Sequence, residues 1–544
     1  MTSTFPLRSN HGRRILATVA ETRAVGPPSR PWVSIPEDDN DLGQGYRDIS
    51  FKELNSAANY AVCLLAATTH CGRFVYVGPN DLRYPIFALA AAKRRTMMIL
   101  LSLDATQEER LDILQRFRCS AFFCAACRLP KVREMLGSNP GLPLVVVPEL
   151  NTFLNAEDIT PFFYPVQWSE GHGEPWIMFH TPGDPRPVTI HTQRTMAACD
   201  LIAALPNMDN CIFTQYVRRR WFTSAGFQTM LGMMMALSMP TFLETTLVIG
   251  PAGLPPEEKV LDILQDGCVE GALLSTDCIK KVWSKPLKDL KLPRLKVVQY
   301  YDDSLTEELR RNLDPIHVVP CISDKATGIL LTNVKKELIT CGYVAFEKHA
   351  GVEFHEYSSN LHEFSIVRQP DYEVEPAFWI SVMDSYWPKE LWVQHPISEN
   401  YWRRFAKCRD MPQMRNSALM TIIEAHMKVR SAIVFRCANS ILLVELFPEA
   451  LEKGRHEKFV ESLQPYIEKF NSYRPPMGLL STDRLIIARK RHFARIADGS
   501  VDVMETYARF NDEIKAILHQ QIKGVTVDPV SLQLLKLAID LDPL

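Results

Sequence analysis

Apolar and polar positions along the chain follow two periods, one typical of buried strands and one of amphipathic helices. Residues 74–101 predict an apolar strand, a loop with the capping residues Asn80 and Asp81, a helix, and a second strand at 97–101. The scheme recurs at 107–125, 256–275 and 292–313. Because a strand, helix, strand unit favours a parallel sheet, residues 50–345 predict an α/β domain with helices on both sheet faces.

From about residue 343 the pattern alternates with turn signals and predicts a small antiparallel β-subdomain. After Cys408 the pattern predicts a small, mobile α+β domain: a helix, two strands joined at 438–440, and helices at 458–470 and 504–518. The predicted organisation is a flexible N-terminal arm (1–30), a large α/β domain (31–407), a small C-terminal subdomain (408–523) and a tail helix (524–544).

Composition narrows the class of protein. The chain has 544 residues, 46% of them apolar, and a net charge of -2, which favours two or more domains and argues against nucleic acid or an anionic membrane as partner. The most apolar window, 227–250, contains Pro240 and Glu244 and therefore predicts a buried helix and strand rather than a membrane span.

Thirteen cysteines without a secretion signal predict reduced thiols and a cytoplasmic location. The close pair Cys124 and Cys127 has no second pair to complete a zinc site, so both are predicted to be buried structural thiols and no metal is expected.

The stretch "WIMFHTPGDPRPVTIHTQ", residues 176–193, predicts two strands joined by a Gly-containing loop that could hold a phosphate. Asp184 in this loop would repel one. His180 and His191 flank the loop and could act as acid or base with Asp184 and Arg186, although a histidine beside a strand is more often only hydrogen-bonded.

The order of segments resembles the adenylation domains of adenylate-forming enzymes, most closely those of fungal nonribosomal-peptide-synthetase-like reductases. The resemblance rests on "YVGPNDLRYPIFALAAAK", "EERLDIL", "GVEFHEYSSNLHEFSIVRQP", "KELWVQHP", "AHMKVRSAIVF" and "YARFNDEIKAI", and covers about residues 30–520. It implies activation of a carboxylic acid by ATP and magnesium to an acyl adenylate, with a C-terminal subdomain that carries a lysine to the reacting phosphate.

The same resemblance implies a nucleotide site that is degenerate in this chain. In the phosphate loop Thr181 and Gly183 remain and Arg186 can replace the lysine, but Asp184 intrudes. Two prolines in the loop also remove N–H donors. An ordinary turn between two strands is the alternative interpretation.

Four further motifs of the family can be aligned with this chain. Three depart from the family pattern and one keeps it. In "CISDKATG", Ser323 is a nucleotide-site candidate, Asp324 replaces a threonine, and Lys325 replaces the magnesium-binding glutamate, although magnesium needs oxygen ligands. At the hinge motif of the family, this chain has residues that include Lys407 and Arg409. At the position of the family's catalytic lysine, it has Asp498. Glu390 keeps the ribose-binding carboxylate, unless it is only an exposed loop residue.

The acid-substrate side of the site is better preserved. Trp221, Phe222, Phe227 and Met230 are predicted to line an apolar pocket, with the basic residues 218–220 at its mouth. Met230, Met233 and Met234 are alternatively plain core residues at helical spacing.

These observations leave three hypotheses open. The first is an ATP-independent cyclisation, isomerisation or dehydration of an apolar or aromatic small molecule, with or without a carboxylate. The second is a non-catalytic scaffold for a biosynthetic partner protein, and the third is a divergent but active acyl-adenylate ligase. No cofactor is expected under the first two, and weak binding of ATP or AMP and Mg2+ is the disfavoured alternative.

Overall fold

The computed structural model describes most of the chain, with gaps. The described residues are 12–27, 30–68, 72–102, 105–137, 142–156, 159–181, 188–203, 208–253, 257–283, 292–302, 305–334, 342–358, 361–367, 385–388, 390–395, 398–407, 413–414, 422–436, 441–448, 456–472, 480–488, 491–495, 501–502 and several short pieces up to 517. By contact density the chain divides into two units, the larger comprising 1–352 and 366–386, the smaller 353–365 and 387–544.

The first sheet of the larger unit has six strands, all parallel except the last. In sheet order they are β6 (Leu144–Val147), β5 (Ala121–Ala125), β3 (Arg73–Val77), β4 (Met97–Leu100), β7 (Pro175–His180) and β8 (Val188–Thr192). The connecting helices include α2 (Phe51–Thr68), α3 (Arg83–Lys93), α4 (Gln107–Arg116), α5 (Leu129–Leu136), α6 (Leu150–Leu154), α7 (Trp168–Gly171) and α8 (Gln193–Met196).

The second sheet of the larger unit has seven strands, again parallel except at one edge. In order they are β13 (His317–Pro320), β12 (Val297–Tyr301), β11 (Gly271–Ser275), β9 (Arg220–Thr223), β10 (Thr246–Val248), β1 (Val33–Pro36) and β2 (Tyr46–Ile49). Its helices are α9 (Met230–Met233), a π-helical turn (Met234–Ser238), α10 (Met239–Leu243), α11 (Glu257–Asp266), α12 (Thr276–Val282) and α13 (Glu307–Asn312).

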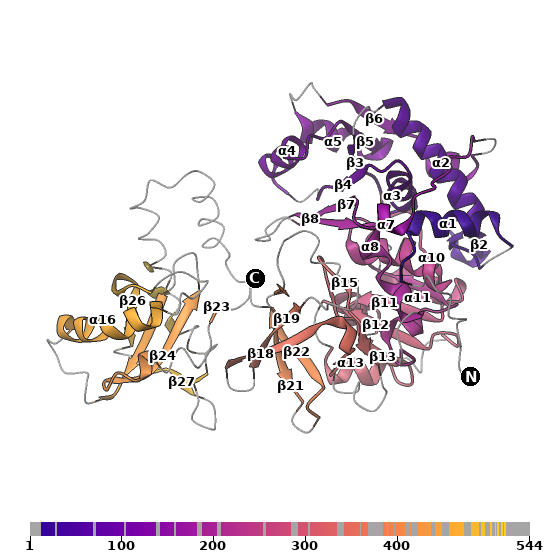
Figure 1. The fold of residues 1–544 in the computed structure, drawn as a ribbon. Helices are drawn as coiled ribbons and strands as arrows, with labels where there is room; N and C mark the ends of the chain where they lie inside the picture. Colours follow the sequence, from indigo (N-terminus) through magenta and orange to yellow (C-terminus); the bar gives the residue numbers. More distant parts are fainter. Residues whose placement is uncertain are drawn as a thin grey trace. The chain divides into compact units, whose positions relative to one another are not determined.

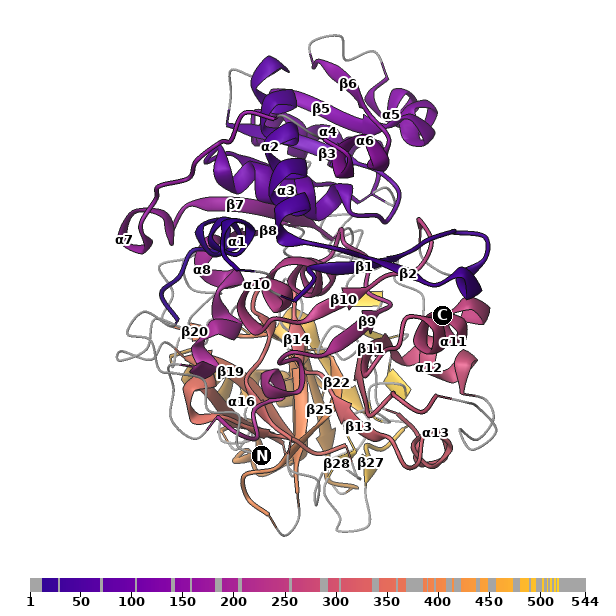
Figure 2. The same ribbon diagram turned by 90° about the vertical axis from the view of Figure 1, so that its right-hand side faces the viewer.

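The largest apolar core fills the space between these two sheets, where Figures 1 and 2 show α1, α8 and α10. Separate cores cover the outer face of each sheet, one around Ile113 and Val132, the other around Ile263 and Ile279. The predicted α/β class with helices on both faces is therefore confirmed. No helix in the described parts of the chain is long and apolar enough to cross a membrane.

The prediction of a loosely ordered arm over residues 1–30 is wrong for residues 12–27. They form a segment whose helix α1 (Leu16–Val25) buries Leu16, Val19 and Ala20 in the central core. These three residues recur at i, i+3 and i+4, the spacing of one helical face. Residues 1–11 lie outside the described part of the chain.

The loop after β3 keeps the predicted capping at Asp81 but not at Asn80. Helix α3 begins at Arg83 without a side-chain cap from its N-cap residue, Leu82. Asp81 instead accepts a hydrogen bond from the Arg83 backbone N–H at 3.0 Å and pairs with its guanidinium at 2.7 Å. Asn80 Oδ1 accepts from the backbone N–H of Phe227 at 2.7 Å, so it joins this loop to the one after β9.

A small antiparallel sheet and a C-terminal sheet follow. The first is formed by β18 (Val352–Ser358), β19 (Leu361–Val367), β21 (Glu390–Gln394) and β22 (Trp402–Lys407), with β20 (Ser385–Tyr386) beside β19. The second contains β23 (Gln413–Met414), β24 (Val429–Arg436), β25 (Ile441–Leu446) and β26 (Leu485–Ala488), with helix α16 (His456–Ser472) packed on it. The antiparallel texture predicted after residue 343 is confirmed, and the domain limits at 407 and 523 stay predictions.

Candidate functional site

The β7–β8 hairpin places the two predicted histidines on opposite faces. His180 pairs with Val188, and His191 pairs with Ile177. Because paired residues of an antiparallel ladder share a face and neighbours alternate, His180 lies with Met178 on the outer face, while His191 faces the central core. The expectation that both histidines serve one site is therefore wrong.

His180 is the histidine that is available for chemistry. It is 8% exposed, and neither ring nitrogen has a hydrogen-bond partner among the residues that the structure describes. Burial lowers the pKa of His180; the charge of Glu109 opposes this, and those of Arg110 and Lys325 add to it. The imidazole is therefore neutral at pH 7 and has a nitrogen that can accept a proton.

His191 has a structural role. It is fully buried, with its ring edge-to-face against Phe179 at 5.5 Å. Its Nε2 lies 2.7 Å from the backbone carbonyl oxygen of Lys325, which can only accept, so Nε2 carries the proton. Burial lowers the pKa of His191 to about 4. This residue ties the hairpin to the turn that contains Lys325.

That turn joins β14 (Ser323–Asp324) to β15 (Gly328–Ile329). One Asp324 oxygen, Oδ1, accepts from the Ala326 backbone N–H at 2.8 Å and from the Tyr386 hydroxyl at 2.6 Å. Ser323 and Lys325 are half-buried beside it. The carboxylate therefore holds the turn closed, and Lys325 is fixed through its own carbonyl. Sequence reasoning missed Tyr386, because nothing in its spacing signals a partner 62 residues away.

Only part of the predicted phosphate loop can be placed. Thr181 directly follows β7 and is exposed, so its hydroxyl can reach a ligand in solvent. Gly183, Asp184 and Arg186 lie in 182–187, outside the described residues, as do Arg409 and Asp498.

Two of the aromatic residues predicted to line one pocket lie on opposite faces of strand β9. Trp221 faces the central core, where its ring stacks on Tyr216 at 4.1 Å and a Cβ at Gly271 would lie 2.4 Å from it. Phe222, the next residue, packs in the outer core with Ile263. Adjacent residues of a strand point to opposite faces, so Trp221 and Phe222 cannot line one pocket. That part of the prediction is wrong.

Phe227 and Met230 do lie together beyond the carboxyl end of β9, both buried in the central core. Gly328 of β15 packs against the methionines that follow, because a Cβ there would lie 2.5 Å from Met234 Sδ and 3.2 Å from Met230 Cε. The backbone at Gly328 has a φ of +69°, which also favours glycine. The methionines thus form a wall against the turn that holds Lys325.

The arginines predicted at the pocket mouth lie at the opposite end of β9. Arg220 begins the strand, where its guanidinium contacts Asp48 at 3.1 Å and Ser34 Oγ at 2.7 Å. Arg218 pairs with Glu244 at 2.8 Å. Phe227 follows the carboxyl end of the same strand, so these cations do not flank it, and the prediction is wrong.

Glu390 is buried rather than an exposed loop residue. It begins β21 and is 6% exposed, with its Oε1 3.4 Å from Arg404 of β22. Its cross-strand partner in the register is Lys407. The contact with Arg404 already uses part of the hydrogen-bonding capacity of this carboxylate.

Sequence reasoning also missed a group of hydroxyls at the carboxyl ends of β9, β11 and β12. Ser224 Oγ lies 3.2 Å from the Tyr301 hydroxyl and accepts from the Ser275 backbone N–H at 2.9 Å. Burial raises the pKa of Tyr301 to about 12, so its hydroxyl stays protonated. The available signal was that each residue ends or directly follows an apolar strand of a parallel sheet, the edge where ligands bind in such folds.

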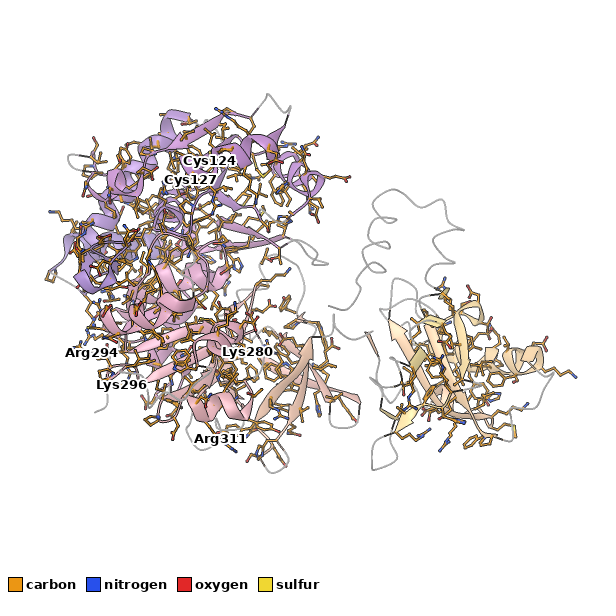
Figure 3. The ribbon with its side chains drawn as sticks, turned by 180° about the vertical axis from the view of Figure 1, so that it is seen from behind. Cys124, Cys127, Lys280, Arg294, Lys296 and Arg311 are labelled. Carbon is orange, nitrogen blue, oxygen red and sulfur yellow. The ribbon has the colours of Figure 1, made fainter. Side chains whose placement is uncertain are left out.

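The cysteine pair was only half predicted. Cys124 lies buried within β5, but Cys127, in the turn after the strand, is exposed and is not a core thiol; both are labelled in Figure 3. Within the described ranges, no group of three or more His, Cys, Asp or Glu side chains is arranged to hold a metal ion. The residues at the predicted magnesium position, Asp324 and Lys325, do not fit that ion, since one is engaged in the turn and the other is a cation.

Comparison with known proteins identifies the class. Residues 414–521 match the family described as AMP-binding enzyme C-terminal domain. The chain is 22% identical to a carboxylic acid reductase of Neurospora crassa over 96% of its length, and 21% identical to an isocyanide synthase-NRPS hybrid of Aspergillus fumigatus over 93%. It spans 52% of the first relative and 33% of the second.

A solved structure of similar fold is the anthranilate CoA ligase AuaEII in complex with anthranoyl-AMP, with a TM-score of 0.58, 12% identity, and coverage of 94% of this chain and 99% of that one. The chain therefore has the fold of the adenylate-forming enzymes, its C-terminal part matches an AMP-binding enzyme domain, and along most of its length it is similar to two fungal proteins.

Proposed function

We propose that this chain is an adenylation-fold protein that acts on an apolar small molecule without ATP. The observation that carries the proposal is the turn at Asp324 and Lys325. A lysine stands where the family has its magnesium-binding glutamate, and His191 and Tyr386 hold the turn in place. A cation in that position repels magnesium, and one oxygen of the preceding carboxylate, Asp324 Oδ1, already accepts two hydrogen bonds.

His180 is the proposed general acid or base. It lies at the end of β7, on the strand that leads into the former phosphate loop, and it is neutral and without a described partner. Its ring nitrogen takes a proton from the substrate. The imidazolium that results returns this proton at another position in an isomerisation or cyclisation, or delivers it to a leaving hydroxyl that departs as water in a dehydration. We assign His191 to holding the hairpin instead, because it is fully buried and its Nε2–H is engaged by the Lys325 carbonyl.

The apolar part of the substrate is expected against the methionine wall formed by Met230 and Met234, beside Phe227. Flexible thioethers can adapt to an irregular apolar ligand. Ser224 and Tyr301 supply hydroxyls for a polar group of the same ligand. Asp184 and Arg186, which follow His180 in the sequence, complete the proposed catalytic set.

The competing function is acyl adenylation. It is favoured by the names of the similar proteins, a carboxylic acid reductase and a CoA ligase solved with anthranoyl-AMP. The test is ATP–pyrophosphate exchange with a panel of aryl and aliphatic acids. No exchange with any acid is expected, and exchange above the enzyme-free rate with one acid would decide for adenylation.

Conversion without ATP is the positive test. Candidate apolar acids and alcohols are incubated with the protein, and products of unchanged mass or of one water less are sought by mass spectrometry. We expect conversion that is lost in His180→Asn and retained in His172→Asn, a matched change of a histidine that stacks on Trp168 away from the site. Equal conversion by both variants would remove His180 from the mechanism.

A further inference from the structure

One stretch of the chain carries a local excess of positive charge. Residues 280–296 contain seven Lys and Arg and a single acidic residue, Asp289, a net charge of +6 in a chain whose total is -2. The rest of the sequence therefore carries a net charge of -8. This stretch runs through α12 to the start of β12.

A further cation, Arg311 of α13, belongs to the same region of the larger unit. The Asn312 side chain at the end of α13 donates to the carbonyl oxygen of Trp283, which follows α12, at 3.0 Å. The Lys296 N–H donates to the Glu270 carbonyl at 2.9 Å, and its own carbonyl accepts from the N–H of His317, the first residue of β13, at 3.0 Å. These bonds hold the end of α12, the end of α13 and the amino ends of the strands in one region.

Five described cations make up this basic edge: Lys280, Lys281, Arg294, Lys296 and Arg311. All are exposed. Figure 3 labels four of them on the part of the larger unit formed by β11–β13, away from Cys124 and Cys127 on the other sheet. Lys280 also pairs with Asp277 at 2.9 Å, but Asp277 is 78% exposed and such a pair contributes little.

The basic edge lies away from the proposed site. Arg294 and Lys296 precede the first residue of β12, whereas Ser224 and Tyr301 lie at the carboxyl ends of the strands. The side chains at the two ends of a parallel sheet are separated by the length of the strands. The charge therefore does not serve the ligand proposed above.

The side chains around these five cations indicate which class of partner they suit. A membrane surface needs apolar side chains to insert, and within the described parts of 276–314 no large apolar side chain is exposed. A single nucleic-acid strand needs aromatic platforms, whereas Trp283 and Tyr300 in this region are buried. Lysine-rich, solvated cations suit the carboxylates of a protein surface.

We propose that the basic edge is a docking surface for an acidic segment of a partner protein. The interaction is electrostatic, so it sets the rate and specificity of association and weakens as salt rises. The proposal does not depend on the chemistry assigned to His180.

The probe is a fluorescent peptide of about twenty glutamates, followed by anisotropy at low salt, with the full chain and no other ligand. The test variant is Lys280→Glu, Arg294→Glu, Lys296→Glu and Arg311→Glu combined. The control, Lys52→Glu, Arg116→Glu, Lys131→Glu and Arg133→Glu, makes the same change in net charge at exposed cations elsewhere in the larger unit. A second test variant with Gln at the same four positions separates loss of attraction from introduced repulsion.

We expect the test variants to raise the Kd for the peptide at least tenfold and the control to raise it less than threefold, with unchanged thermal unfolding. Equal weakening by test and control variants would reduce the effect to overall charge and overturn the proposal. The proposal would also fall if duplex DNA or vesicles with anionic lipid bound more tightly than the peptide and lost binding in the same variants.

Discussion

At the residue scale, the buried His191 makes stability depend on pH. Its pKa is about 4 in the folded chain and about 6.5 when unfolded. The unfolded state therefore binds the proton more readily, and stability is fully present above pH 6.5 and falls as the pH decreases toward 4. Between pH 7 and 5 this residue alone lowers the free energy of unfolding by about 2 kcal/mol.

His191→Gln keeps a donor for the Lys325 carbonyl and removes the titration. Urea unfolding at pH 7 and 5 should therefore show a smaller pH dependence in the variant than in the parent. A parent and variant with the same slope would mean that His191 is not buried as described.

His180 is expected to matter for conversion of the substrate and little for stability. Since it has no hydrogen-bond partner among the described residues, His180→Leu removes a buried polar group and should leave the free energy of unfolding within about 1 kcal/mol of the parent. The same variant should lose conversion of the substrate. Chemical denaturation measures the first effect, and a loss of stability above 2 kcal/mol would assign His180 to the fold rather than to catalysis.

At the scale of single elements, α1 is held by a buried ion pair. Lys93 is fully buried, with Glu21 of α1 at 2.6 Å, and its Nζ also donates to Asn55 and Asn59 of α2. Glu21→Gln leaves this ammonium without its counter-charge and should cost about 3 kcal/mol of unfolding free energy. The matched change Asp277→Asn, in an exposed pair, should cost less than 1 kcal/mol. Similar costs for both would contradict the anchoring role of α1.

Most helices and strands could be predicted from the sequence. Which side chains share a face of a sheet could not always be predicted, because this depends on how the strands pair. The β7–β8 hairpin and the β3–α3–β4 unit lie where the apolar pattern indicates. The separation of His180 from His191 depends on the pairing of β7 with β8, which a loop of unknown length does not fix. Trp221 and Phe222 are a different case, because the alternation of a strand already assigns adjacent residues to opposite faces.

Contacts between segments far apart in the chain could not be predicted from the sequence. The bonds from His191 to Lys325 and from Tyr386 to Asp324 span 134 and 62 residues. The substitution of a lysine at the magnesium position was visible from the family resemblance, but the way the turn is held was not. The α1 helix was missed because its apolar face is short and prolines follow it.

At the scale of the whole molecule, the two parallel sheets and the C-terminal match define an adenylate-forming fold. The turn at Lys325 is tied to the β7–β8 hairpin through His191, and the methionine wall packs against the same turn at Gly328. The hydroxyls of Ser224 and Tyr301 lie at the carboxyl ends of the second sheet, the edge where ligands bind in such folds.

The central claim, that the chain no longer uses ATP, is tested most directly by calorimetric titration of Mg-ATP into the full chain, with Lys325→Glu titrated in parallel. We expect no binding heat for the parent up to about 1 mM ATP, the upper range of ordinary substrate affinities. The variant should gain little, because Asp324 and the prolines of the loop remain. Binding of Mg-ATP to the parent with a micromolar Kd would contradict this claim and favour an active adenylating enzyme.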